Sequence, residues 1–288
     1  MAGRWIIALF VCGAALAQAP PDTAETTALI ETIRDQALAF SKHLPNFICT
    51  QVTRREVALA EDSMVGVRSS RGGVSVPSRG AGQWQLSDTI EEQLSFFDHH
   101  ENYKVLKLNG KPPSASESRP AGLASTGEFG TTLDSIFEPE TQTQFEWKRW
   151  ETLRGRPAAV FTYRVEKEKS MSELATPASH VVVAYHGLIY ADRDTKTVLR
   201  VTSEAEAPKG FPLQDVTHVL DYSVVSIAGD KFVLPINSEM QSRASEEFFK
   251  YGTTHDLNSR QLMMRNKIEF RGYRKYAADA ELKIDPDK

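Results

Sequence analysis

Cys49 is the residue whose chemistry most needs an explanation. The chain has two cysteines, Cys12 and Cys49, and Cys12 falls in a segment that we expect to be removed. A mature chain that keeps Cys49 alone can form no internal disulfide. Three roles stay open for this thiol: a small buried hydrophobe on a strand, half of an intermolecular disulfide, or a nucleophile activated by a base. Phe47 and Cys49 are two residues apart, so their side chains share one face of an extended segment, and this favours burial.

His99-His100-Glu101 is the densest run of potential metal ligands. Adjacent side chains on a strand point to opposite faces, so the two histidines cannot easily share one ion. The order also differs from the H-E-x-x-H motif of zinc proteases. We interpret the run as a solvated turn.

Asp192 and Asp194 have the spacing of two early calcium ligands. An EF-hand loop needs more oxygen ligands and a distant glutamate, and Lys196 interrupts this one, so we predict a hairpin turn. The sequence holds no G-x-S-x-G, phosphate-binding loop or G-x-G-x-x-G motif. We predict no metal site, no cofactor and no catalytic residue.

Glu128 could serve as an acid, but a simpler role is available. Ser125 and Glu128 have the S-x-x-E spacing of a helix capping box. His180, His186 and His218 lie in predicted strands, where packed or surface histidines are the usual case. None of these residues requires a catalytic interpretation.

Composition describes an ordinary globular protein. The chain has 288 residues, of which 41% are hydrophobic and 25% charged. This length suits one large domain or two small ones and can bury a core without disulfides. The net charge of −4 excludes nucleic acid as an expected partner.

The N-terminus has the pattern of a signal peptide. Arg4 precedes an apolar run over 5–17, which is shorter than the roughly 20 residues of a spanning helix. Small residues follow, and we expect cleavage after Ala17. Cys12 lies in the middle of the run, which disfavours lipidation. We therefore expect a periplasmic or secreted protein with a signal peptide at 1–17, no transmembrane segment in the mature chain, one domain over 22–275 and a charged tail at 276–288.

Two helices are predicted. Residues 22–44 carry an apolar stripe at helical spacing and end at Pro45. Residues 125–138 start at the capping box, present Leu133 and Ile136 on an apolar face and end at Pro139. Each helix needs a flat apolar surface to cover.

The rest of the chain favours antiparallel strands joined by short turns. The predicted strands are 47–59, 84–97, 103–108, 145–153, 158–166, 180–190, 197–204, 216–227, 231–243 and 261–273. A loop rich in Gly, Ser and Arg at 65–83 is expected to be mobile. Together these predict an α+β fold: a large curved antiparallel sheet, an incomplete barrel, covered by an N-terminal helix and a second central helix.

The concave side of such a sheet is a natural apolar cavity. The residues predicted to line a ligand there are Phe129, Phe137, Trp147, Phe161, Tyr163 and Tyr185.

Two stretches carry a family resemblance. The segment VLDYSVVSIAGDKFVLPINSEM, at 219–240, resembles the late strands of the outer-membrane lipoprotein-sorting (LolA-like) and RseB-like superfamily. GLIYADRDTKTVLRV, at 187–201, looks like the preceding hairpin, whereas 97–139 does not match the short lipoprotein carriers. The resemblance implies an incomplete barrel that holds acyl chains or lipoprotein segments.

The first functional hypothesis is a non-enzymatic exported binding or carrier protein that holds a lipid, an acyl chain or a lipoprotein segment in an apolar concavity. The alternatives are a structural or sensor module of the cell envelope that binds another envelope protein, and a hydrolase of unrecognised type.

Overall fold

The computed structural model describes residues 19–60, 82–114, 123, 127–176, 179–245 and 261–276. The helices are α1 (Thr23–Lys42) and α2 (Thr131–Phe137), with short 3-10 turns at Pro139–Thr141 and Lys167–Lys169. The strands are β1 (Phe47–Leu59), β2 (Gln85–Phe97), β3 (His100–Leu108), β4 (Gln144–Leu153), β5 (Arg156–Val165), β6 (Glu173–Ala175), β7 (His180–Val182), β8 (Tyr185–Asp192), β9 (Val198–Ala205), β10 (Leu213–Ile227), β11 (Asp230–Ser245) and β12 (Gln261–Lys275).

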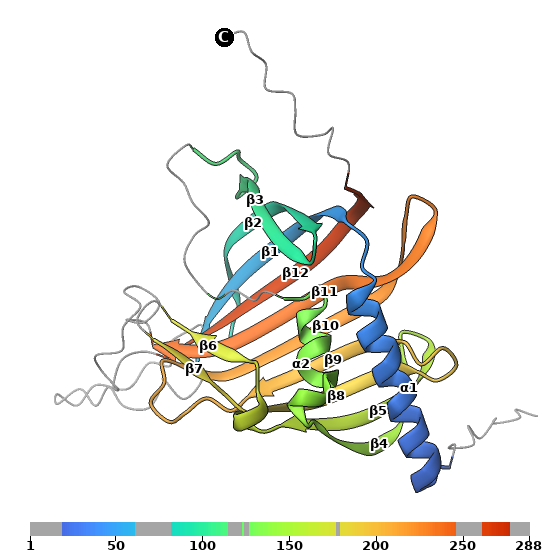
Figure 1. The fold of residues 1–288 in the computed structure, drawn as a ribbon. Coiled ribbons are helices and arrows are strands. Elements are labelled where there is room, and N and C mark those ends of the chain that lie inside the picture. The colour runs from blue at the N-terminus through green and yellow to red at the C-terminus, as the bar shows by residue number, and fades with distance from the viewer. Residues whose placement is uncertain are drawn as a thin grey trace, which may run out of the picture.

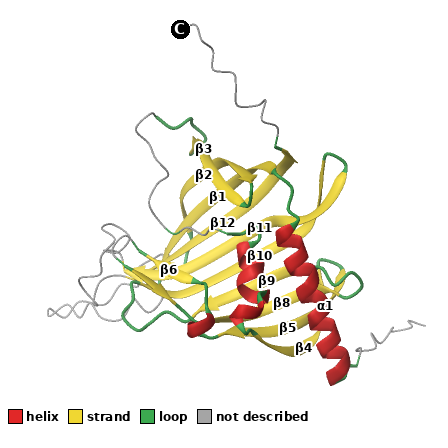
Figure 2. Ribbon diagram, in the orientation of Figure 1, coloured by secondary structure: helices red, strands yellow, loops and turns green. Residues whose placement is uncertain are grey.

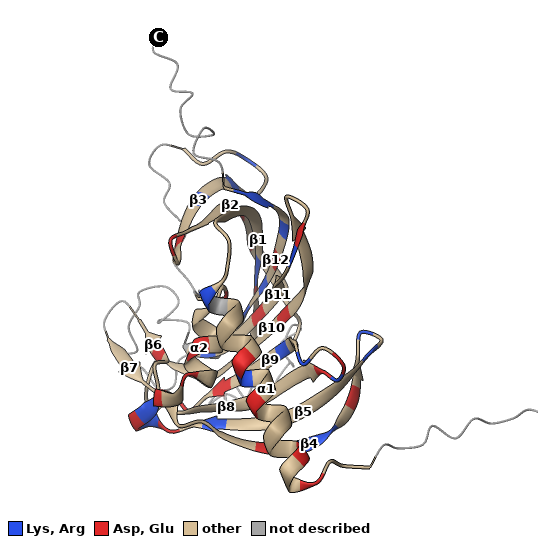
Figure 3. Cartoon of the chain, turned by 45° about the vertical axis from the view of Figure 1, so that its right-hand side comes forward, with Lys and Arg blue, Asp and Glu red and all other residues tan. Residues whose placement is uncertain are grey.

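Ten of these strands form one antiparallel sheet in the order β3-β2-β1-β12-β11-β10-β9-β8-β5-β4. Most neighbours follow one another in the chain, as expected for strands joined by hairpins. The exception that shapes the fold is β1, which pairs with β12 from Phe47 opposite Lys275 to Leu59 opposite Leu262. The sheet curls toward the helices, and its terminal strands β3 and β4 do not join (Figures 1 and 3). The predicted α+β fold with an incomplete barrel is confirmed.

Both helices lie on the same face of the sheet, here called the inner face; the opposite face is the outer face (Figure 2). Helix α1 begins at a reciprocal capping box. The Asp22 carboxylate accepts from the Glu25 N–H at 2.8 Å, and the Glu25 carboxylate accepts from the Asp22 N–H at 3.2 Å. The helix ends at Lys42, before Pro45, so the prediction for 22–44 is confirmed within two residues at each end.

Helix α2 is present but shorter than predicted. It begins after Gly130, whose φ is 119°, and no side chain caps it. The predicted capping role of Glu128 is therefore wrong, and Ser125 lies outside the described residues. Glu128 is buried instead, with 1% exposure. The segment before the helix is held by hydrogen bonds to the Glu101 carboxylate.

The predicted strand 180–190 is also wrong as a single element. The chain forms β7, passes through buried Val183 and Ala184, and then enters the main sheet as β8. β7 pairs only with β6, a strand that the sequence did not indicate, in a separate two-stranded sheet. An uninterrupted β-rich sequence does not reveal where a chain changes from one sheet to another.

Several predictions fall outside the described residues: the signal peptide at 1–17, most of the loop at 65–83 and nearly all of the tail at 276–288. The single domain over 22–275 stays a prediction. Of the helices in the described ranges, neither α1 nor α2 has the length and apolar character needed to cross a membrane.

Candidate functional site

Apolar side chains fill the space between the helices and the inner face. The largest core cluster joins Ile33 and Ala37 of α1, and Ile136 and Phe137 of α2, to inner side chains of β5, β8, β9 and β10. These four helix residues are at most 3% exposed. Among the described residues, close packing of this kind fills the space beneath the helices with side chains, so we expect a ligand to enter there only if a helix moves.

The six residues predicted to line a ligand divide between two clusters. Phe137, Phe161, Tyr163 and Tyr185 are buried beneath the helices, and Trp147 packs half-buried against them. Phe129 lies apart, in a second cluster with side chains of β1, β2, β10, β11 and β12. The structure thus brings five of the six together. Their contact with a ligand stays a prediction.

Cys49 belongs to the second cluster and is 1% exposed. Burial raises the pKa of its thiol to about 12, so almost no thiolate exists at neutral pH. The interpretation of Cys49 as a small buried hydrophobe is confirmed. A nucleophilic role would need a different environment.

Glu101 holds the segment that leads into α2. Its carboxylate accepts hydrogen bonds from the backbone N–H groups of Gly127 and Phe129, each at 3.2 Å, and from the Tyr103 hydroxyl at 2.5 Å. Burial, helped by the nearby Glu128 carboxylate, raises the pKa of Glu101. These contacts place the Phe129 ring in the second cluster, 5.2 Å from the centroid of Phe47 and 5.1 Å from that of Phe270.

The run His99-His100-Glu101 is therefore a solvated turn only in part. His99 lies in the turn, with φ of 61°, and His99 and His100 are exposed. Glu101 points into the protein and bonds the α2 lead-in, so its assignment to a solvated turn is wrong. In the described part of the chain, no group of three or more His, Cys, Asp or Glu residues could hold a metal ion.

The His218 side chain stands on the inner face, on strand β10. Its Nε2 lies 2.7 Å from the Ser238 hydroxyl, and burial lowers the pKa of His218 to about 4. A general base works best with a pKa near the operating pH, so this pair is better explained as a hydrogen-bonded core contact. His180 and His186 lie toward solvent, and His186 Nδ1 is 3.4 Å from the Glu206 carboxylate.

The Asp192 turn has the predicted role. One Asp192 oxygen accepts from the backbone N–H of Asp194 at 3.0 Å and of Thr195 at 2.8 Å, and the other accepts from Arg156. The hairpin interpretation is confirmed. These hydrogen bonds lower the pKa of Asp192 although burial opposes them.

A half-buried aromatic strip follows the terminal strand β4 beside α1. Trp147 contacts Trp150 and Phe161, with ring centroids 4.9 Å and 5.4 Å apart, and Phe145 stacks on Phe137 at 5.6 Å. The Trp150 indole donates a hydrogen bond to the carbonyl of Ala19 at 3.2 Å. We call Phe145, Trp147 and Trp150 the β4 aromatic strip. It is the place where the inner apolar cluster reaches the edge of the sheet.

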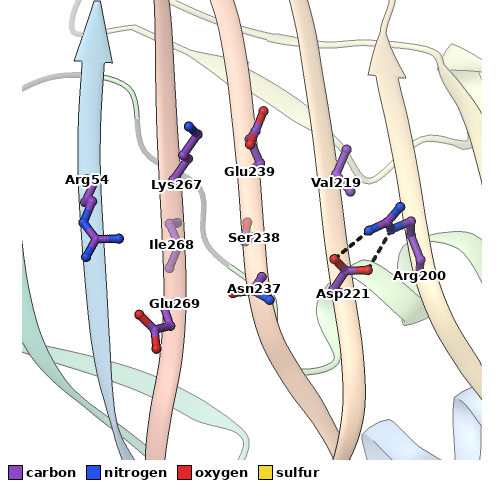
Figure 4. A pocket seen from close by; sticks show the side chains of 10 residues that line it. All are labelled: Arg54, Arg200, Val219, Asp221, Asn237, Ser238, Glu239, Lys267, Ile268 and Glu269. Carbon is purple, nitrogen blue, oxygen red and sulfur yellow. Dashed lines mark hydrogen bonds and ion pairs between the residues drawn. The ribbon is translucent and has the colours of Figure 1, made fainter. Parts of the chain in front are cut away.

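The outer face has an open hollow of about 440 Å³, here called the outer groove (Figure 4). It is lined by Arg54, Arg200, Val219, Asp221, Asn237, Ser238, Glu239, Lys267, Ile268 and Glu269. These residues come from five adjacent strands, β1 and β9 to β12. The sequence alone does not single out these residues, because strand alternation shows which side chains share a face but not whether they leave a hollow.

One wall of the outer groove is an ion-paired network. Arg200 makes two hydrogen bonds to Asp221, at 2.7 and 2.8 Å, and Arg154 lies 3.3 Å from the same carboxylate. The Arg200 pair is the two-pronged arrangement that holds a guanidinium and a carboxylate in fixed geometry. This wall is therefore internally satisfied.

Comparison with known proteins gives structural matches alone. No protein-family model matches the chain, and no curated protein matches it. A putative outer-membrane lipoprotein-sorting protein domain from Vibrio parahaemolyticus matches over 85% of this chain and 92% of its own, with 13% identity and a TM-score of 0.35. A LolA superfamily protein from Nitrosomonas europaea matches over 86% and 93%, with 10% identity and a TM-score of 0.34.

MucB, solved in complex with MucA, matches over 85% of this chain and 98% of its own, with 12% identity and a TM-score of 0.19. The chain is thus distantly similar in structure to a lipoprotein-sorting domain, a LolA superfamily protein and MucB. At these values it is too remote to carry a ligand or an activity over to this chain.

Proposed function

We propose that this protein is an exported, non-catalytic binding protein that holds an acyl chain, from a lipid or a lipidated protein, between α1 and the inner face. The observation that carries the proposal is how α1 is attached. Its buried side chains are apolar, among them Ile30, Ile33 and Ala37. The side-chain hydrogen bonds of Thr27, Thr32 and Arg34 run within the helix. Export is inferred from the N-terminal sequence pattern.

Because α1 is held by apolar contacts, an acyl chain can replace the contacts that α1 makes with the inner face. Apolar contacts are not directional, so an acyl chain can take the place of a helix side chain without leaving a hydrogen bond unmade. Each CH₂ group that leaves water contributes about 0.8 kcal/mol. A long acyl chain can therefore offset much of the apolar contact that α1 gives up when it lifts.

The β4 aromatic strip is the proposed mouth of the site. Its side chains are half-buried and continue the apolar cluster to the terminal strand, beside the first turns of α1. An acyl chain that enters there meets Trp147 first and then Phe161, Tyr163 and Tyr185. Of the other predicted lining residues, Phe137 lies in the largest core cluster beneath the helices. Phe129 lies in the second cluster.

A fluorescent fatty acid that emits in apolar surroundings tests this proposal. We expect saturable binding by the wild-type protein and a rise in its melting temperature with ligand concentration, because a ligand of the folded state stabilises it. Trp147→Ala should weaken binding about tenfold, which corresponds to about 1.4 kcal/mol.

Trp84→Ala is the matched control. The Trp84 ring stacks on the Arg265 guanidinium at 4.0 Å, on the outer face, so its removal should leave binding unchanged within twofold. Absence of saturable binding by the wild type, or equal losses in the two variants, would contradict the proposed site.

A further inference from the structure

The outer groove contains polar groups that the protein itself leaves unused. In the described part of the chain, the Arg54 guanidinium, the Asn237 amide and the Glu269 carboxylate make no hydrogen bond or ion pair. Figure 4 shows Arg54 and Glu269 on neighbouring strands, with no contact drawn between them. Each of these groups retains its full capacity to bind a ligand.

Several other charges on the outer face are paired. Arg265 and Lys267 both reach Glu56, Lys267 at 3.4 Å, and Arg243 lies 2.8 Å from Asp215. Arg54 differs because the residue directly opposite it on β12 is Lys267, a like charge. Like charges opposite each other on neighbouring strands are destabilising. An anionic group from outside would relieve this repulsion.

Apart from Asp221, the two carboxylates of the groove stand on β11 and β12. Glu239 is directly opposite Lys267 in the pairing of β11 with β12, and Asn237 is opposite Glu269. The open part of the groove therefore presents two cations, two carboxylates and one amide. A ligand of a single charge sign would be attracted by half of these groups and repelled by the other half.

We propose that the outer groove binds an extended peptide segment of a partner protein that carries an acidic and a basic side chain close together. The acidic side chain is placed between Arg54 and Lys267, and the basic one between Glu239 and Glu269. The Asn237 amide, which both donates and accepts, suits the N–H and C=O groups of the peptide backbone.

The groove has the size and rigidity for this role. Its volume of about 440 Å³ is within the range of sites for small ligands and short peptide segments. Its side chains stand on the central strands of the sheet, which hold them more precisely than loops would. The proposal goes beyond acyl-chain binding, because the groove lies on the face opposite the helices.

Fluorescence anisotropy with labelled hexapeptides tests the proposal. The mixed peptide repeats Lys-Ser-Glu, and two reference peptides repeat Lys-Ser-Lys and Glu-Ser-Glu. We expect the mixed peptide to bind saturably and each reference peptide at least about tenfold more weakly, because each loses a charge-assisted contact and gains a repulsion. Added salt should weaken the binding of the mixed peptide.

Variants locate the binding. Arg54→Gln and Glu269→Gln should each reduce affinity for the mixed peptide about tenfold. Neither residue has an internal partner, so neither variant should lower the melting temperature, and Arg54→Gln should raise it slightly because it removes the repulsion with Lys267. Lys231→Gln, a charge removal at the exposed β10–β11 turn, is the matched control and should bind as the wild type does.

Three results would overturn the proposal: equal binding of the three peptides, binding that neither groove variant weakens, or displacement of the peptide by the neutral sugar maltotriose, which would assign the groove to saccharides. The fatty-acid titration is run on the same variants. Arg54→Gln and Glu269→Gln should leave the affinity for the fatty acid unchanged. Failure of peptide binding and failure of acyl-chain binding are therefore separate results.

Discussion

Gly187→Ala is expected to destabilise the protein by at least about 3 kcal/mol, near the upper end of what overpacking costs. Gly187 lies on β8 directly opposite Ser203 of β9. A Cβ at this position would stand 1.9 Å from the Thr202 carbonyl oxygen and 2.7 Å from its carbonyl carbon. Neither atom can rotate away, because both belong to the backbone of the neighbouring strand.

The Thr202 carbonyl also accepts the hydrogen bond of the buried Tyr163 hydroxyl, at 3.0 Å. Moving β9 to admit a methyl group would therefore disturb the strand pairing and a core tyrosine together. Urea denaturation of the wild type and the variant measures the effect. The melting temperature of Gly187→Ala should lie about 6 to 12 °C below that of the wild type, for a domain of this size.

Gly210→Ala is the control for this prediction. Gly210 has a φ of 83°, so alanine is strained there, but no atom lies within 4 Å of the added Cβ. Its cost should be limited to about 1 kcal/mol for the left-handed backbone. Equal costs at the two glycines would mean that the close approach of β8 and β9 is not what constrains Gly187.

Glu101→Ala is the second change with a large expected effect, a loss of about 2 to 4 kcal/mol. The substitution removes the acceptor of the Gly127 and Phe129 N–H groups and of the Tyr103 hydroxyl. A buried donor left without an acceptor costs about 1 to 3 kcal/mol, and solvent entering near the α2 lead-in would recover part of this. Chemical denaturation measures the loss.

Glu101→Gln separates charge from shape and predicts a pH dependence. The pKa of Glu101 is raised in the folded protein, mainly by burial and further by Glu128. The folded state therefore takes up a proton at a higher pH than the unfolded chain, and stability increases as pH falls through the folded pKa toward the unfolded value of about 4.3.

The Gln variant lacks this titration. The free energy of unfolding of the wild type should thus rise relative to that of Glu101→Gln as pH is lowered from neutral toward 4.5. A difference that stays constant with pH, or that changes in the opposite direction, would show that Glu101 is not buried as a carboxylate beside Glu128.

Local patterns predicted most of the elements. Hairpins such as β10–β11 were predictable because a short turn fixes the pairing of the strands on either side. The stripe of α1 was predictable because helical spacing is a strong signal over twenty residues. These two features already imply a sheet with one face covered.

Long-range contacts were not predictable. The pairing of β1 with β12 joins residues more than 200 positions apart in the chain, for example Arg265 with Glu56, whose hydrogen bond spans 209 residues. Glu128 matched a capping box, yet the contacts of Glu101 with the preceding segment decide where α2 begins. The outer groove was missed because alternation shows which side chains face outward and not whether they leave a hollow.

The central claim is that the inner face carries an acyl ligand beneath α1, and native mass spectrometry of the protein purified without detergent from its own cell envelope tests it most directly. We expect a fraction of the molecules to carry an extra mass that is released by organic solvent and fragments as a fatty acyl group. Molecules that show only the mass of the bare mature chain, in repeated preparations, would contradict the claim.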